Sequence, residues 1–379
     1  MFQLRRLALV LTLTLPLSTP LLAADCEGLE ELLLPDVTIT EVTDLEKPKP
    51  HCKVEGRISH SIGFTVWLPH EWNGRFAMGG QGGFAGAVDN QAEAFGQVLS
   101  KGYATAGTDT GHQANGLDGS WALHDLEAIA NYGHVAIHRV TEVSKAMIAA
   151  HYDKSPETSF FLGCSNGGRQ ALQEAQRYPD DFDVILAGAP ALDFDGLAAA
   201  FLYITQRMYP DMEDLSTPVV TREDRTLLRQ AILDRCDGRD DLEDQILADP
   251  NACDFDTASL ACGEGTSEGC LTPQKLAAID AIYDGPRSAN GEPLHVGFPF
   301  GAEDVELNGW GSWLVGRENG AGPGVPNAAF GFGTGLAKYF VYQRPEWSYE
   351  GYGFETWGKD TLAVQKTLNA DSPDLDAFR

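Results

Sequence analysis

The chain has 379 residues, 43% of them hydrophobic, and its 55 acidic against 27 basic residues give a formal net charge of −28. This length accommodates a large domain with a second one beside it, and the hydrophobic fraction supports a real core. The acidic excess argues against a nucleic-acid partner and against anionic membrane surfaces. We expect a soluble protein with an acidic surface.

The N-terminus has the pattern of a secretory signal peptide. Arg5 and Arg6 precede an apolar run over residues 7–22, and two alanines follow as a small-residue cleavage site. The run contains two prolines and is short for a membrane span, and the acidic residue before Cys26 argues against a lipoprotein anchor. We predict a signal peptide over residues 1–24, no membrane anchor, and a secreted or periplasmic location.

Seven cysteines in an oxidising compartment indicate disulfides. Joining sequence neighbours gives three bonds: Cys26–Cys52, Cys236–Cys253 and Cys262–Cys270. The remaining Cys164 is then expected to be unpaired.

Two early strands lead into a glycine-rich loop. Apolar side chains alternate with others over residues 62–68, which predicts a strand with one buried face, and a second strand begins at residues 75–78. That strand runs into residues 79–86, where Gly82 and Gly83 lie. Such a loop either offers backbone N–H groups to an oxyanion or is a mobile surface loop.

Strands and helices alternate in the part of the chain that follows. Short apolar strands are expected at residues 102–108 and 184–187, and a helical stripe of apolar residues spans 136–150. This alternation predicts an α/β fold with a mostly parallel sheet.

A G-x-S-x-G sequence at residues 163–167 separates an apolar strand at 159–162 from a helix at 169–178. In this strand–turn–helix context the pattern is typical of a nucleophile elbow, which exposes the hydroxyl of its serine, here Ser165. The N–H of the next residue, Asn166, is then a second oxyanion donor. The alternative is a glycine-rich turn in an ordinary sheet.

The character of the sequence changes in its second half, where loops lengthen, cysteines cluster and strand alternation fades. We expect an α/β core over residues 25–201, an inserted disulfide-rich lid over 202–345, and a return toward the core over 346–379. Within the lid, capped helices are expected after Thr221 and Thr272.

An acidic loop between Cys236 and Cys253 holds Asp237, Asp240 and Asp244. Three carboxylates in one stapled loop suit a hard cation, calcium above all, although the spacing is not that of an EF-hand. A solvated acidic loop explains the same charges.

Other residues allow two interpretations. His112 ends a predicted strand and is a candidate base, while His134 and His138 lie one helical turn apart and are either a metal pair or packing residues. Three lid residues are candidates for an aromatic pocket with a carboxylate anchor, although tryptophans more often just pack: Trp310, Trp313 and Arg317.

The chain resembles the tannase and feruloyl esterase family from about Cys26 to its end. The most specific stretch is GCSNGGRQALQEAQRYPDDFDVILAGAPA, residues 163–191. Supporting motifs, in the family's order, are WNGRFAMGGQGGFAG, TDTGH, the pair Trp310 and Trp313, and RPEWSYEGY. The resemblance implies an α/β-hydrolase core with a lid, and hydrolysis of small aromatic acid esters such as feruloyl or galloyl esters.

The resemblance also implies roles for individual residues. Ser165 is the acyl nucleophile, and the N–H groups of Asn166 and of the Gly82–Gly83 loop form the oxyanion hole. The loop after Cys236 binds a structural calcium ion through three side chains and two carbonyls: Asp237, Asp240 and Asp244, with Leu242 and Ile246. The family often has glycine where this chain has Asp241 and Gln245.

One departure from the family concerns the base. Members carry a catalytic Asp, and then a His followed by Cys, after the lid, whereas this chain ends in NADSPDLDAFR. The only histidine after Ser165 is His295, within the expected lid. We therefore expect the last strands, the catalytic Asp and His and the partner of Cys164 to be absent, and the chain as given to be inactive.

Three hypotheses follow. The first is a secreted serine carboxylic ester hydrolase whose complete form is longer, favoured by the elbow, the loop and the signal peptide. The second is a non-catalytic protein that binds aromatic ligands on the same scaffold, favoured by the missing base. The third is a calcium-stabilised structural protein, which the elbow argues against.

Overall fold

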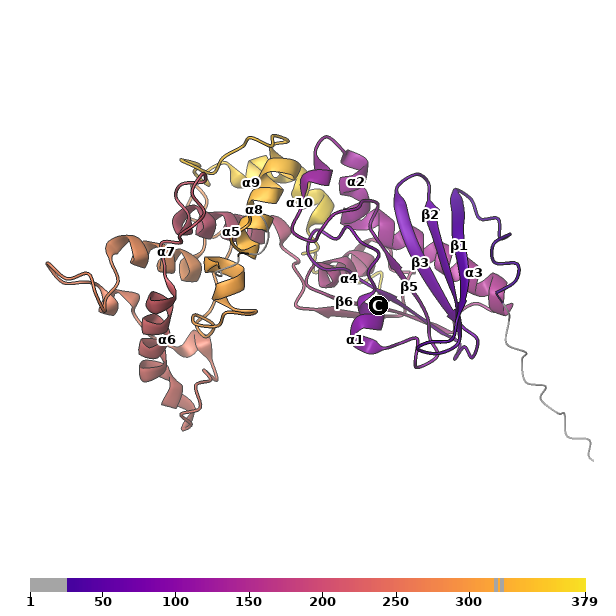
Figure 1. Ribbon diagram of the computed structural model, residues 1–379, viewed down its shortest axis with the longest axis horizontal. Helices are drawn as coiled ribbons and strands as arrows, with labels where there is room; N and C mark the ends of the chain where they lie inside the picture. The colour runs from indigo at the N-terminus through magenta and orange to yellow at the C-terminus, as the bar shows by residue number, and fades with distance from the viewer. Residues whose placement is uncertain (1–25, 317–319, 321–323) are drawn as a thin grey trace, which may run out of the picture.

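The computed structural model describes residues 26–316, 320 and 324–379, and Figure 1 shows its arrangement. The predicted signal peptide and Arg317 lie outside these residues. No helix among the described residues has the length and apolar character needed to cross a membrane.

A seven-stranded sheet forms the centre of the first half, with the strand order β1-β2-β3-β5-β4-β6-β7. The strands are β1 (Val37–Leu45), β2 (His51–Ile58), β3 (Ile62–Pro69), β4 (Arg75–Gly79), β5 (Ala104–Thr108), β6 (Thr158–Cys164) and β7 (Val184–Gly188). The β1–β2, β2–β3 and β3–β5 pairs are antiparallel, and the β5–β4, β4–β6 and β6–β7 pairs are parallel. The fold is α/β as predicted, but the sheet is mixed rather than mostly parallel, because β1, β2 and β3 join it through antiparallel pairs. Strands β1 and β2 were not predicted.

Strand β3 differs from its prediction in burial. The expected apolar face is buried, but Gly63 and Thr65 on the other face are buried as well. The Asp109 carboxylate covers that side, where its Oδ1 accepts a hydrogen bond from Gly63 N–H at 2.8 Å. The alternating sequence pattern predicted a strand with one buried face, but both faces of β3 are covered. Small and hydroxyl-bearing residues, rather than apolar ones, occupy the second face.

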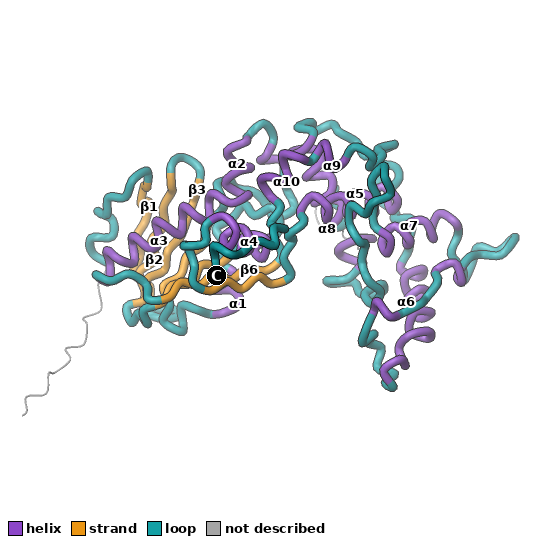
Figure 2. Tube along the Cα trace, turned by 180° about the vertical axis from the view of Figure 1, so that it is seen from behind, coloured by secondary structure: helices purple, strands orange, loops and turns teal. Residues whose placement is uncertain are grey.

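Helices cover the sheet and continue beyond it. They are α1 (Gln91–Gly96), α2 (Leu126–Ala130), α3 (Ala136–Tyr152), α4 (Asn166–Arg177), α5 (Phe194–Met208), α6 (Arg222–Cys236), α7 (Pro273–Asp284), α8 (Ala328–Gly335), α9 (Trp357–Asp360) and α10 (Leu362–Leu368). Figure 2 shows α3 and α4 lying across one face of the sheet. The apolar stripe predicted for residues 136–150 is the buried side of α3 as far as Ile148, whereas Ala150 is exposed.

A helical region of residues 209–316 lies at the opposite end of the molecule from β1–β3, with α6 and α7 in it (Figure 1). Helix α6 starts with a capping box formed by Thr221 and Asp224, and α7 starts with Thr272 as N-cap. Helix α5 runs through residue 201, so the expected change from core to lid falls inside one continuous helix. Its apolar residues belong to two hydrophobic clusters, one with Phe84 of the glycine-rich loop and one with α6 and α7.

Three disulfides tie the described chain, and they are the pairs expected from the sequence. Cys26–Cys52 joins the N-terminal segment to β2, while Cys236–Cys253 and Cys262–Cys270 staple the helical region. Cys164 is a free thiol. The sheet ends at β7, the last strand of the described residues, where Leu186 is 61% exposed.

Candidate active site

Ser165 occupies the sharp turn between β6 and α4. Its backbone has φ 61° and ψ −120°, a conformation that a non-glycine residue adopts only at a cost of about 1–3 kcal/mol. The turn is held by two backbone bonds, Ser165 N–H to the Gly188 carbonyl at 3.0 Å and Ala191 N–H to the Ser165 carbonyl at 3.1 Å. The strain is therefore maintained by the end of β7 and the loop that follows it.

Glycines on both sides of Ser165 let the strand and the helix approach each other. A Cβ at Gly163 would lie 2.1 Å from the Gly167 carbonyl oxygen, and a Cβ at Gly168 would lie 2.5 Å from the Gly188 oxygen. Gly80 faces the same crossing, where its Cβ would lie 2.6 Å from Gly167 Cα. No side chain fits at these positions, so the G-x-S-x-G pattern reflects close backbone packing.

Gly83 and Asn166, the two residues expected to supply oxyanion N–H groups, line the same small cavity as Ser165. Asn166 opens α4, where the first N–H groups of a helix have no acceptor within it. Gly83, with φ 55°, lies on the glycine-rich loop, and Gly83, Ser165 and Asn166 line one cavity. Gly82 is adjacent but exposed and does not line it. Within the described residues, no hydrogen bond occupies the N–H of Gly83 or of Asn166.

The loop that carries Gly83 is fixed rather than mobile. The hydroxyl of Tyr132 donates to the Gly83 carbonyl at 2.9 Å, and the Phe84 N–H donates to the Gly116 carbonyl at 2.8 Å. His112 Nε2 donates to the Phe84 carbonyl at 2.8 Å, and its ring stacks on Trp121 with centroids 3.7 Å apart. Burial lowers the pKa of His112 to about 4, so the ring is neutral at neutral pH.

Two residues that the sequence analysis did not identify, Arg169 and Gln91, contact the Ser165 turn and support it. Arg169 is fully buried, and its Nε donates to the Asn166 Oδ1 at 2.8 Å while Nη1 reaches the Leu368 carbonyl at 3.1 Å. Gln91 accepts from Cys164 N–H at 2.7 Å. Only the position of Arg169, one turn into the elbow helix, was visible in the sequence; its partners come from distant segments.

The cavity beside Ser165 has a volume of about 150 Å³ and mostly apolar walls. Its aromatic residues are Phe84, Phe194, Phe201, Trp313 and Phe332. They come from the glycine-rich loop, α5, the helical region and α8, so the cavity lies where the sheet end meets the helices. An aromatic ring beside Ser165 would meet aromatic surface on several sides.

No histidine lines the Ser165 cavity, and all nine histidines of the chain lie within the described residues. His112 is used in the loop contact described above. His134 Nδ1 lies 2.8 Å from the Tyr178 hydroxyl, and His138 Nδ1 lies 2.7 Å from the Asp181 carboxylate. His295 lies in a neighbouring cavity with Asp193, and its Nδ1 accepts from Gly297 N–H at 3.1 Å. The two helix histidines therefore have separate partners and share no metal site.

The acidic loop is not gathered into a carboxylate cluster. Among the described residues, the only group of three or more His, Cys, Asp or Glu ligand atoms within 4.8 Å is Cys26, Cys52 and His70, and its two sulfurs form a disulfide. Asp240 Oδ1 and Asp244 Oδ1 accept from Leu242 and Ile246 N–H groups.

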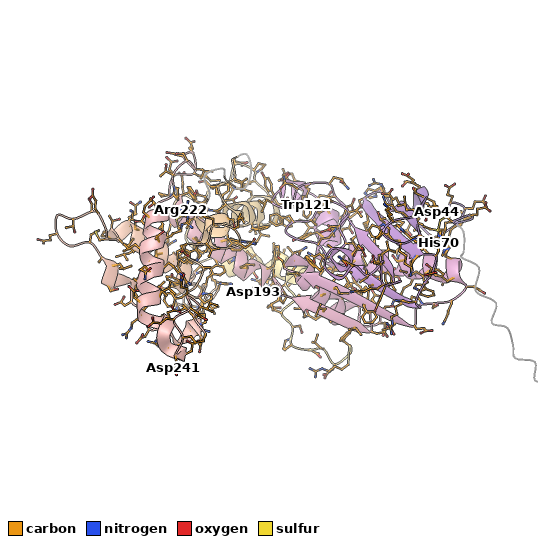
Figure 3. All side chains as sticks on the ribbon, turned by 60° about the horizontal axis from the view of Figure 1, so that its bottom comes forward. Asp44, His70, Trp121, Asp193, Arg222 and Asp241 are labelled. Carbon is orange, nitrogen blue, oxygen red and sulfur yellow. A yellow bond between two sulfur atoms is a disulfide. The ribbon has the colours of Figure 1, made fainter. Side chains whose placement is uncertain are left out.

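Asp237 differs from the other two carboxylates because it is buried and its Oδ1 has no hydrogen-bond partner. Asp241 and Gln245 have φ of 69° and 66°, the left-handed region that glycine favours. Figure 3 shows Asp241 at the tip of the helical region.

The two predicted tryptophans of the lid both line a second, larger cavity, and only Trp313 also lines the Ser165 cavity. Trp313 is 37% exposed, and Trp310 is 3% exposed.

The sequence over residues 45–379 matches the family described as tannase and feruloyl esterase. An uncharacterised esterase of Xanthomonas campestris is 34% identical over 96% of this chain and 66% of its own length. The mono(2-hydroxyethyl) terephthalate hydrolase of Piscinibacter sakaiensis is 31% identical over 71% of this chain and 52% of its own length. This chain thus spans about half to two thirds of the length of these relatives.

A crystal structure of feruloyl esterase B from Aspergillus oryzae is similar to this chain in fold. It has a TM-score of 0.78 at 25% identity, covering 94% of this chain and 72% of that one. A tannin acyl hydrolase from Aspergillus niger, at 20% identity and a TM-score of 0.63, supports the same fold.

Proposed function

Because the chain belongs to the tannase and feruloyl esterase family, we propose that it is a secreted carboxylic ester hydrolase that forms an acyl-enzyme on Ser165. The observation that carries this proposal is the strained turn of Ser165 beside two unoccupied N–H groups. Strain of this kind persists where the surroundings enforce it and is concentrated at active sites.

The chemistry follows from the positions of these groups. Attack of the Ser165 oxygen on an ester carbonyl places negative charge on the carbonyl oxygen. The N–H groups of Asn166 and Gly83 stabilise this oxyanion in a water-poor cavity. The serine must also lose its proton, and no histidine of this chain lines the cavity. We therefore expect slow turnover by the chain as given, of the order of the 10³–10⁴-fold acceleration that remains without a triad.

The substrate class follows from the walls of the cavity. Phe84, Phe194, Phe332 and Trp313 line the space beside Ser165. These surfaces suit the ring of an aromatic acid ester such as a feruloyl or galloyl ester. We propose that the helical region serves as the lid that selects the acyl group, because Trp313 comes from it.

A second candidate function is non-catalytic binding of aromatic ligands. The observation that favours it is the absence of histidine from the walls of the cavity beside Ser165. Under this function Ser165 would contact a ligand without being acylated.

Acylation distinguishes the two functions. The chain and its Ser165→Ala variant are incubated with p-nitrophenyl ferulate, and the intact mass and the modified peptide are measured. An esterase site accumulates a feruloyl adduct on Ser165, because the acyl-enzyme also lacks a base for its hydrolysis. Saturable binding of the ester with no Ser165-dependent adduct supports the second function.

We also propose that the acidic loop holds a structural calcium ion. Asp237 Oδ1 is a buried oxygen without a donor, which a cation would satisfy. The positive φ at Asp241 and Gln245 supports the loop geometry that the family forms with glycines. The ligands would be the Asp237, Asp240 and Asp244 side chains and the Leu242 and Ile246 carbonyls, with the loop carboxylates drawn together by the ion.

A further inference from the structure

A second cavity of about 610 Å³ lies in the helical region, and the proposed chemistry does not use it. Volumes of this size are typical of small-molecule sites. Five aromatic side chains line it: Phe201, Phe298, Phe300, Trp310 and Trp313. Three polar side chains interrupt this surface: Arg229, Gln245 and Asn308.

The two cavities share a wall. Phe201 and Trp313 line both the Ser165 cavity and the second one, and their ring centroids are 6.2 Å apart. Trp313 is 37% exposed, so its ring is not locked into a core. A ligand bound at Ser165 therefore reaches the second cavity by passing this pair of rings.

Arg229 determines what the second cavity can recognise. Its guanidinium lies 3.7 Å from Glu303 and 3.8 Å from Asp304, and its Nη2 donates to the Gln245 carbonyl at 2.6 Å. Its Nη1 is the atom that faces Glu303 Oε2 at 3.7 Å, and within the described residues neither of these two buried atoms has a hydrogen bond. The charge of Arg229 is thus balanced, while one of its N–H groups is not satisfied.

This balance favours a neutral ligand over an acid. A carboxylate at Nη1 would approach the fully buried Glu303 and the neighbouring Asp304, and like charges repel strongly in a buried site. A neutral phenol, methoxy or carbonyl oxygen beside the guanidinium avoids that repulsion. The side-chain amides of Gln245 and Asn308 can pair with a phenolic hydroxyl.

We propose that the second cavity is a subsite for a neutral, hydroxylated aromatic ring, carried by the same ester whose acyl group lies beside Ser165. The inference rests on the proposed function of the Ser165 cavity and narrows its substrates to esters with two aromatic rings. The first ring packs beside Ser165, the linker passes Phe201 and Trp313, and the second ring meets Trp310 and Arg229.

The test compares three ligands on the Ser165→Ala variant by calorimetry. Ethylene glycol diferulate has two rings, 2-hydroxyethyl ferulate has the same linker without the second ring, and methyl ferulate has neither. Burial of a second ring predicts that the diferulate binds roughly 30-fold more tightly than 2-hydroxyethyl ferulate. Equal affinities would overturn the proposal.

Two arginines of α6 make a matched pair for mutation. Arg229→Met removes the donor in the cavity, whereas Arg222→Met removes an exposed arginine at the start of the same helix (Figure 3). Arg229→Met should weaken diferulate binding about 10-fold and leave methyl ferulate binding unchanged, and Arg222→Met should change neither. Equal losses in the two variants would count against the subsite.

A second variant covers the case in which Arg229→Met does not fold. Asn308 is exposed with φ 61°, so Asn308→Gly is compatible with its backbone and removes one polar group from the cavity. Asn308→Gly should weaken binding of the diferulate about 3-fold and leave binding of methyl ferulate unchanged. If diferulate binding is not selectively weakened, the polar wall has no role in recognition. If no adduct forms on Ser165 but the diferulate still binds more tightly than 2-hydroxyethyl ferulate, the proposed acylation is wrong and the proposed ring subsite is supported.

Discussion

The crossing of β6 and α4 at Gly163 allows a quantitative prediction. In a Gly163→Ala variant the new Cβ would lie 2.1 Å from the Gly167 oxygen and 2.3 Å from its carbonyl carbon. Contacts below 3.0 Å essentially never occur, so strand and helix would have to separate by about 0.9 Å. Both neighbours are backbone atoms of a helix start, and no side chain can rotate away.

The expected loss of stability is at the upper end of overpacking effects, about 3 kcal/mol. Urea and thermal unfolding measure it, with Gly358→Ala as control, because a Cβ at Gly358 meets no atom within 4 Å. Since alanine favours a helix, the control should be unchanged or slightly stabilised. If the two variants were equally stable, the close approach of β6 and α4, and with it the geometry of the Ser165 turn, would be wrong.

Three further predictions follow from other contacts. Tyr132→Phe removes the hydroxyl that donates to the Gly83 carbonyl. The free energy of unfolding should fall by about 1 kcal/mol, and the rate of adduct formation on Ser165 should fall as well. An unchanged acylation rate would show that this hydrogen bond does not position the glycine-rich loop. Burial, and then the charge of Asp195, raises the pKa of the Asp193 carboxyl to about 6. The native state therefore binds the Asp193 proton more tightly than the unfolded chain does. The stability that this proton contributes is lost as the pH rises from about 4 through 6. Asp193→Asn keeps a good N-cap and should flatten that loss, with a gain at pH 7.5 below about 1 kcal/mol because the group is partly exposed; identical urea midpoints of variant and parent at pH 4.5 and 7.5 would contradict this. Calcium at 100 times its dissociation constant should add about 2.7 kcal/mol of stability, and Asp237→Asn should abolish the thermal shift; a shift that survives this substitution would place the ion elsewhere.

The parts of the fold that sequence predicted well are local. The turn at Ser165 depends on glycines within five residues of one another, and the Thr221 and Thr272 caps bond within their own first turns. The disulfides join cysteines 8 to 26 residues apart. The sequence signal of each feature lies among neighbours along the chain, although the Ser165 turn is also held by the Gly188 carbonyl and the Ala191 N–H.

The parts that escaped prediction depend on distant segments. Strand β1 pairs with β2 along one edge, and its alternation of exposed and half-buried residues is too weak to mark a strand. Arg169 finds acceptors 36 and 199 residues away, and Gln91 reaches Cys164 across 73 residues. No local sequence pattern encodes such distant partners. The sequence therefore identified Ser165 but not the residues that support its turn.

The most direct test of the central claim is rescue by an external base. Hydrolysis of methyl ferulate is followed for the chain and for Ser165→Ala, each with and without added imidazole, which can enter the cavity and take the serine proton. We predict only slow turnover without imidazole and a much faster, Ser165-dependent rate with it. An equal rate in both proteins with imidazole would show that Ser165 is not presented for acyl transfer, and a robust Ser165-dependent rate without imidazole would show that the chain already supplies a base.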